Sequence, residues 1–240
     1  MRWIRIVCGL AASLSLLVCA MALGCRMAGA QSPSTPAPSP IPPPRFAVVL
    51  DAAHGGDDAG GRLASGQLEK AATLAFSVRL RSLLGARGMT VATTRESDVT
   101  VEAAQRATIA NRAKAAACLS IHATESGSGI HLFTSSLAPT QPTQFVAWKT
   151  AQSAWITRSL ALSGAINSAL QHDSFSVTLS RTALSAVDNM TCPALAIEIA
   201  PARGPDGKVT AEPEDPDYQA RIANSLAAAL LEWRMEPHQP

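Results

Sequence analysis

Short apolar runs alternate with longer amphipathic segments along residues 46–233. Runs of strand length cover 46–51, 89–94, 117–122, 129–133, 175–179 and 194–199. Apolar residues recur at helical spacing over 69–86, 101–115, 152–170 and 218–233. Because most strand candidates are apolar throughout, both faces of their sheet should be covered. The pattern predicts a three-layer α/β domain in which helices flank a mostly parallel sheet on both faces.

The chain before residue 46 differs in composition from the segments that follow it. Arg2 and Arg5 flank an apolar run over 6–24, and Ala28-Gly29-Ala30 has the small-x-small form of a signal-peptidase site. Proline and serine dominate the residues that follow, a composition typical of an extended tether. We therefore predict three parts: a signal peptide over 1–30, a Pro/Ser-rich linker over 31–45 and a folded domain over 46–236.

Two alternatives to a cleaved signal peptide over residues 1–30, the leader, stay open. Cys25 follows a sequence that loosely resembles a lipoprotein processing site. The apolar run is also about long enough to remain as a membrane anchor, which takes roughly 20 residues. In each case the domain is expected to be exported, to the periplasm or cell envelope, with a membrane tether only through the N-terminal segment.

The charge balance argues against nucleic acid as a partner. Three of the 20 basic residues, Arg2, Arg5 and Arg26, lie in the leader, so the rest of the chain has 17 basic and 18 acidic residues. A domain without excess basic residues lacks the electrostatic footprint of nucleic-acid binding. Aromatic residues make up 4% of the chain, so stacking platforms for bases are not expected either.

Two cysteines, Cys118 and Cys192, remain after the leader. Neither belongs to a CxxC pair, so a structural zinc cluster is not expected. Each lies in or near a strand candidate, which favours two buried free thiols. A disulfide between them would require those strands to be neighbours.

Polar residues gather where the predicted strands end. His54 follows the first strand, His122 ends the run over 117–122, and Glu198 lies near the end of 194–199. Glu69 opens the first helix, after a glycine-rich loop. Because ligands of open α/β sheets bind beyond the carboxyl ends of the strands, these four side chains are candidates for one site.

His54, Glu69 and His122 form a two-histidine, one-carboxylate set, which is typical of hydrolytic zinc sites that leave a further position for water. Zinc lowers the pKa of that water toward neutrality. Glu198 is the candidate general base, because burying a carboxylate in an apolar strand costs free energy unless it has a partner such as the metal and its water. The glycine-rich loop lacks the Gly-Lys-Ser/Thr ending of a phosphate-binding loop.

These residues lie in motifs that resemble a known family, the zinc-dependent N-acetylmuramoyl-L-alanine amidases of bacterial cell walls (amidase-3 type). The resemblance covers about residues 46–233. It is carried by VVLDAAHGG at 48–56, Glu69-Lys70, Thr94-Arg95 with Asp98, the segment 106–111, LSIHA at 119–123 and PALAIEI at 193–199. Ala53 departs from it, at a position where the family usually has glycine.

The resemblance implies zinc bound by His54, Glu69 and His122, with Glu198 as the catalytic carboxylate. It implies a peptidoglycan hydrolase that uses zinc-activated water to cleave the amide between N-acetylmuramic acid and L-alanine of the stem peptide. Two alternatives stay open. One is a zinc peptidase or deacylase on another amide, because the segment after Glu198 leaves the family pattern. The other is a non-catalytic wall-binding module with the same fold.

Three further residues have predicted roles that the structure tests. Arg95 and Arg106 are expected to form structural ion pairs with Asp98 or Glu102 rather than to bind substrate. His131 is expected to be a surface or loop residue without a ligand role.

Overall fold

The computed structural model describes residues 46–140 and 147–235. The predicted signal peptide over 1–30 and linker over 31–45 lie outside these residues, as does residue 236 at the predicted end of the domain. All described residues fall within one unit of the chain, 43–240.

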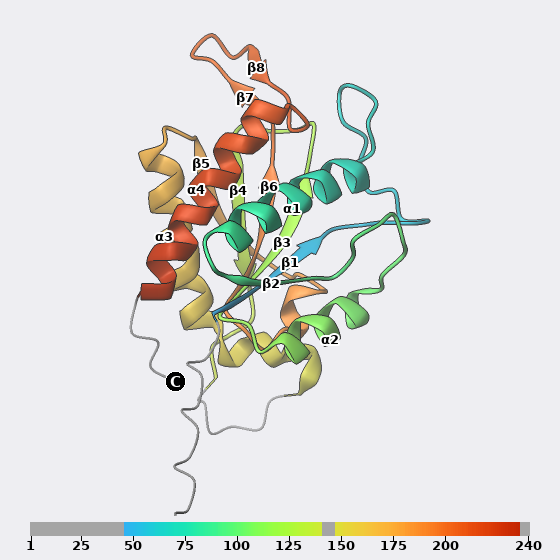
Figure 1. The fold of residues 1–240 in the computed structure, drawn as a ribbon, viewed down its shortest axis with the longest axis vertical. Coiled ribbons are helices and arrows are strands. Elements are labelled where there is room, and N and C mark those ends of the chain that lie inside the picture. The colour runs from blue at the N-terminus through green and yellow to red at the C-terminus, as the bar shows by residue number, and fades with distance from the viewer. Residues whose placement is uncertain (1–45, 141–146, 236–240) are drawn as a thin grey trace, which may run out of the picture. The chain divides into compact units, whose positions relative to one another are not determined.

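A six-stranded sheet forms the centre of this unit, in the order β2-β1-β3-β6-β4-β5 (Figure 1). Its strands are β1 (Ala47–Ala52), β2 (Thr90–Thr93), β3 (Ala117–Ala123), β4 (Ile130–Ser135), β5 (Val177–Thr182) and β6 (Ala194–Ile199). The first four in spatial order are parallel, whereas β4 runs antiparallel to β6 and parallel to β5. The mostly parallel sheet is confirmed. Strands β7 (Ala202–Arg203) and β8 (Val209–Ala211) form a separate pair.

Helices cover both faces of the sheet, as predicted. They are α1 (Glu69–Ala86), α2 (Ala103–Ala113), α3 (Ile156–His172), α4 (Pro216–Met235) and the short η1 (Trp148–Ala154) and η2 (Val187–Asn189). In Figure 1, α4 lies between α3 and α1. None of the helices within 46–140 and 147–235 has the length and apolar character needed to cross a bilayer.

Two apolar clusters show which helices pack on which face. Successive strand residues point to opposite faces. Leu50, Leu119 and Leu195 therefore pack with α1, α3 and α4 in one cluster. Their neighbours Val49, Cys118 and Ala194 pack with residues of α2 and η2 in the other. This alternation assigns the polar residues further along β1, β3 and β6 to one face of the sheet.

The predicted helix over 152–170 is the largest departure from the expected elements. The structure has η1 up to Ala154, a turn at Trp155 and α3 only from Ile156. Gln152 accounts for this break, since its fully buried amide donates to the carbonyls of Met190 and Cys192 at 2.9 and 3.1 Å. A contact across 40 residues thus overrides the local helical pattern.

Cys118 and Cys192 form a disulfide, so the expectation of two free thiols is wrong. Their Cα atoms are 6.2 Å apart, although 74 residues separate them in sequence. The reason is strand order. Cys118 lies in β3, and Cys192 precedes β6, which pairs directly with β3. The bond joins β3 to the segment that leads into β6, on the face covered by α2 and η2.

Candidate metal centre

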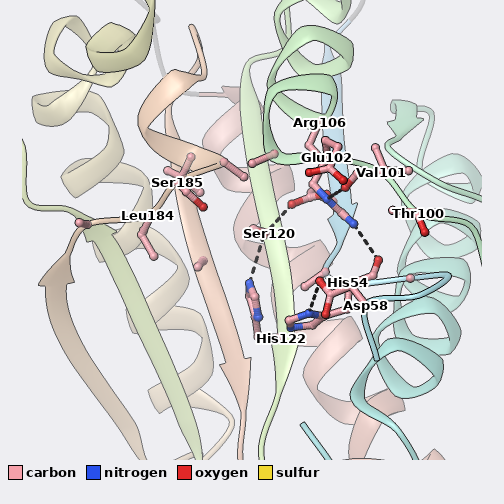
Figure 2. Close-up of a pocket in the computed structure, with 18 residues that line it drawn as sticks. His54, Asp58, Thr100, Val101, Glu102, Arg106, Ser120, His122, Leu184 and Ser185 are labelled. Atoms are coloured by element: carbon pink, nitrogen blue, oxygen red, sulfur yellow. Dashed lines mark hydrogen bonds and ion pairs between the residues drawn. The ribbon is translucent and has the colours of Figure 1, made fainter. Parts of the chain in front are cut away.

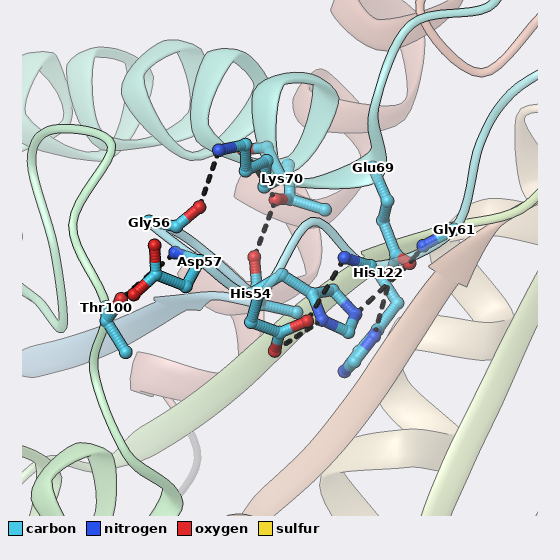
Figure 3. A network of polar contacts seen from close by, with 12 residues as sticks. His54, Gly56, Asp57, Gly61, Glu69, Lys70, Thr100 and His122 are labelled. Atoms are coloured by element: carbon cyan, nitrogen blue, oxygen red, sulfur yellow. Dashed lines mark hydrogen bonds and ion pairs between the residues drawn. The ribbon is translucent and has the colours of Figure 1, made fainter.

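Three side chains meet at the carboxyl end of the parallel strands, as Figure 3 shows. His54 follows β1, Glu69 is the first residue of α1, and His122 lies at the end of β3. His54 Nε2 is 3.1 Å from Glu69 Oε2, and His122 Nδ1 is 3.0 Å from Glu69 Oε1. One potential ligand atom from each residue lies within 4.8 Å of the others, so the group could hold a metal ion.

The loop between His54 and Glu69 is shaped to bring these side chains together. His54 itself adopts a positive φ of 61°. Because the left-handed turn falls on His54, the preceding Ala53 does not need the freedom of glycine. A Cβ atom at Gly60 would lie 2.6 Å from the His54 ring and 2.7 Å from Glu69 Oε2, so the backbone packs directly against both side chains.

Backbone groups fix the Glu69 carboxylate. The N–H of Gly61 donates to Oε2 at 2.8 Å, and the N–H of Ala123 donates to Oε1 at 3.2 Å. Burial alone would raise the pKa of Glu69. The hydrogen bonds from His122, His54 and Gly61 outweigh burial and hold this pKa well below its usual range. The carboxylate is therefore ionised at neutral pH, as a metal ligand must be.

Asp58 supports His54 from the other side of the ring. Its Oδ2 atom is 2.9 Å from His54 Nδ1, the nitrogen that does not face Glu69. The hydrogen bond with Glu69 raises the pKa of His54, and the bond with Asp58 adds to that effect against the opposing influence of burial. A carboxylate on the outer nitrogen of a histidine is a common device for orienting a metal ligand.

A buried polar network lies beneath the site. Asp51 accepts from Arg106 Nη1, Thr94 Oγ1 and Ser120 Oγ, each at 2.7 Å. Ser120 Oγ is in turn 3.5 Å from His122 Nε2. The structural role expected for Arg106 is thus supported, but its ion-pair partner is Asp51 and not Asp98 or Glu102.

Arg95 stabilises the backbone of the same region. Its guanidinium donates to the carbonyls of Ala52, Ala53 and Lys70 at 2.7 to 3.0 Å. Asp98, one of the two partners expected for the arginines, instead pairs with Lys70 Nζ at 2.7 Å. Arg95 therefore supports the backbone after β1. The sequence could not have indicated these contacts, because backbone carbonyl acceptors have no side-chain signature.

An open cavity of about 460 Å³ adjoins the two histidines (Figure 2). One wall is the segment 100–103, which leads into α2, and another is the segment 183–187 before and within η2. Asp51, Arg106 and Ser120 line its inner part. The cavity is open, so solvent reaches His54 and His122.

Glu198 lies beside this group rather than within it. It is the direct partner of His122 in the register of β3 and β6, on the same face of the sheet. Ala196, two residues earlier on that face, lines the cavity. The side chain of Glu198 is hydrogen-bonded to His131, whose Nδ1 is 2.8 Å from Glu198 Oε1.

The expectation that His131 is a surface or loop residue is wrong. His131 lies in β4 between the buried residues Ile130 and Leu132, so its side chain points to the opposite face from theirs. The alternation in this strand could have indicated that face. It could not have indicated the neighbouring strand, because β4 pairs with a strand more than 60 residues away.

Fold and site together define an α/β protein with a candidate metal centre of two histidines and a glutamate at the end of its parallel strands. Over residues 48–232 the chain matches the N-acetylmuramoyl-L-alanine amidase family, Amidase_3. The match spans most of the chain, and the chain belongs to this family. The membership of the N-acetylmuramoyl-L-alanine amidase family that the sequence motifs predicted is confirmed.

Similar proteins agree with this membership. The chain is 42% identical over 89 residues to an endolysin of Bacillus phage SPP1, an alignment that covers 36% of this chain and 32% of the endolysin. It thus spans about a third of the length of that curated relative.

Solved structures share the fold. An N-acetylmuramoyl-L-alanine amidase from Clostridium difficile 630 has a TM-score of 0.63 at 20% identity, with 81% of this chain and 99% of that chain covered. The amidase Ami1 from Mycobacterium smegmatis has a TM-score of 0.63 at 19% identity, with 78% and 96% covered. At these identities, the likeness shows a common fold.

Proposed function

We propose that the chain is a peptidoglycan hydrolase that cleaves the amide between N-acetylmuramic acid and the L-alanine of the stem peptide. Membership of the N-acetylmuramoyl-L-alanine amidase family supports this reaction. The observation that carries it for this chain is the convergence of His54, Glu69 and His122 within 4.8 Å of one another. Their position beside an open cavity gives a polymer access to them.

We propose zinc as the ion and these three residues as its ligands. Two imidazoles and one carboxylate are a donor set that suits zinc and leaves a position for water. The tight packing of Gly60 against His54 and Glu69 suits a site of fixed geometry. When bound, the ion supplies Lewis acidity, which polarises the scissile carbonyl and acidifies water.

Glu198 acts as the general base in this proposal. Its carboxylate takes a proton from the attacking water and passes it to the departing nitrogen. The water oxygen bonds to the lactyl carbonyl carbon, and the carbon–nitrogen bond breaks. The products are a carboxylate on N-acetylmuramic acid and a free amino group on L-alanine. The register that places Glu198 beside His122 supports this role.

We also propose that the protein acts outside the cytoplasm, in the periplasm or cell envelope, where this substrate lies. Residues 1–30 would direct export, and residues 31–45 would link the leader to the catalytic domain over 46–236. Any membrane tether would run through the N-terminal segment.

The test uses purified protein and isolated sacculi, with mass spectrometry of the released material. The expected product is a stem peptide with a free L-alanine amino terminus, and chelation of the metal should abolish its release. Glu198→Gln should abolish release while the protein still contains zinc. Glu125→Gln, which alters an exposed glutamate in the loop after β3, is the matched control and should remain active.

Other products would contradict the proposal in distinct ways. A cut within the peptide or at an acetyl group would indicate a zinc peptidase or deacylase. Binding to sacculi without any new amino terminus would indicate a non-catalytic wall-binding module. Full activity in Glu198→Gln would exclude the role given to that residue.

A further inference from the structure

His122, Glu198 and His131 form one row across three adjacent strands. Glu198 of β6 is the register partner of His122 in β3 and of His131 in β4. The His131 Nδ1 and Glu198 Oε1 atoms are 2.8 Å apart. Both side chains are partly buried, with 19% of His131 and 31% of Glu198 exposed. The proposed base is thus held by a strand that contributes no proposed metal ligand.

Neighbouring groups fix the His131 ring from two further directions. Phe133 packs edge-on against it, with ring centroids 6.3 Å apart at an interplanar angle of 90°. The backbone of Gly127 lies so close that a Cβ atom there would be 2.6 Å from His131 Cε1. The Gly127 carbonyl accepts a hydrogen bond from Arg203 Nε at 3.2 Å, which anchors this part of the loop. The imidazole therefore has little room to turn.

We propose that His131 is a positioning residue that orients the Glu198 carboxylate for proton transfer. The inference rests on the proposed function, in which Glu198 is the general base. A base must be ionised, and an ionised carboxylate only accepts hydrogen bonds, so His131 Nδ1 carries the hydrogen and donates it. Donation to Oε1 restricts rotation of the carboxylate and leaves Oε2 free to accept the proton of water. A base fixed before substrate binds loses less entropy in the transition state.

Two variants of His131 separate positioning from structural support. His131→Leu keeps much of the side-chain volume and removes the donor. We expect kcat on sacculi to fall roughly 10- to 100-fold, with KM and zinc content unchanged. The loss should be smaller than that from removing Glu198, because a general base contributes about 10²- to 10⁴-fold. His131→Asn should recover most of kcat, because its amide nitrogen takes the place of Nδ1.

A glycine pair supplies a second test that leaves His131 itself unchanged. Gly127→Ala introduces a methyl group against the imidazole and should lower kcat by displacing it. Gly207→Ala is the matched control. Gly207 has a similar positive φ, +77° against +80° at Gly127, but nothing lies within 4 Å of its added Cβ. The control carries similar backbone strain and should keep wild-type kcat.

Nitrogen-15 NMR of the histidine rings tests the contact without reference to activity. The wild-type protein should show a hydrogen-bonded Nδ1–H for His131, and Glu198→Ala should abolish or strongly shift that signal. An unprotonated Nδ1 in the wild type overturns the proposal. So does wild-type kcat in His131→Leu, or an equal loss in His131→Asn. A wild-type protein that cleaves no amide overturns the proposed function itself, while the NMR signal separately reports whether His131 holds Glu198.

Discussion

Replacing the buried guanidinium of Arg106 should destabilise the domain strongly. Side-chain exposure is 7% for Arg106 and 2% for Asp51, and their ion pair is 2.7 Å long. The same guanidinium donates to the carbonyls of Ala52, His54 and Val101 at 2.7 to 2.8 Å. Arg106→Met keeps much of the aliphatic stem but removes every one of these donors. It also leaves the Asp51 carboxylate buried without its countercharge.

The magnitude follows from that unpaired charge. Removing one partner of a buried ion pair costs about 3–5 kcal/mol. The hydroxyl groups of Thr94 and Ser120 still donate to Asp51, but they bring no positive charge. In a domain of this size, 1 kcal/mol shifts the unfolding temperature by about 2–4 °C, so we expect a fall of roughly 6–20 °C.

Urea unfolding followed by circular dichroism measures the loss in free energy of unfolding, and thermal unfolding measures the fall in unfolding temperature. Arg81→Met is the matched control, because Arg81 pairs with Glu96 at the surface, with 37% and 68% of the side chains exposed. Such a pair is worth about 0–1 kcal/mol. Adding Asp51→Asn to Arg106→Met removes the unpaired charge and should restore part of the lost free energy. If Arg106→Met unfolds at the same urea concentration as Arg81→Met, the reasoning from burial is wrong.

Three further predictions concern the site, the disulfide and the buried tyrosine. Asp58→Ala should weaken zinc binding about tenfold, because it removes the hydrogen-bond partner of His54 Nδ1. Asp57→Ala is the control and should bind zinc like the wild type. Equal zinc affinities of the two variants by calorimetry would refute this. Replacing Cys118 and Cys192 together with alanine should lower the free energy of unfolding by about 4 kcal/mol, since the bond closes a loop over a sequence separation of 74; an unchanged urea midpoint would contradict it. Burial raises the pKa of Tyr218, the single tyrosine, to about 12. The contribution of the neutral Tyr218 hydroxyl to the free energy of unfolding should therefore be complete below about pH 10 and lost as the pH rises through 12. Tyrosinate absorbance that titrates near 10 in the folded protein would refute this.

Local sequence patterns predicted two elements to the residue. Helix α1 spans Glu69–Ala86 and strand β6 spans Ala194–Ile199, both as expected. Each is specified by apolar spacing within its own segment, with a glycine-rich loop before α1 and Gly88 after it. The same reasoning failed at 152–170, where the chain turns at Trp155 and the buried Gln152 before that turn bonds to a distant segment.

In the candidate site, too, local sequence predicted some residues and distant contacts decided others. His54, Glu69 and His122 could be chosen from the sequence because each follows, opens or ends a predicted element, and parallel strands bring such ends to one edge. Their convergence within 4.8 Å agrees with that choice, while their role as zinc ligands stays a prediction. The surface or loop position predicted for His131 was wrong because nothing near it in sequence indicates Glu198, 67 residues away.

The sequence by itself thus determined the fold class, the places of the main strands and helices, and the residue types at the strand ends, since these depend on neighbours a few positions apart. Only the tertiary structure decided which strands lie side by side. The insertion of β6 between β3 and β4 joins Cys118 to Cys192, places Glu198 beside His122 and gives it His131 as a partner. Strand order follows from how the apolar faces of all the helices and strands are buried together, and no local window of sequence contains that information.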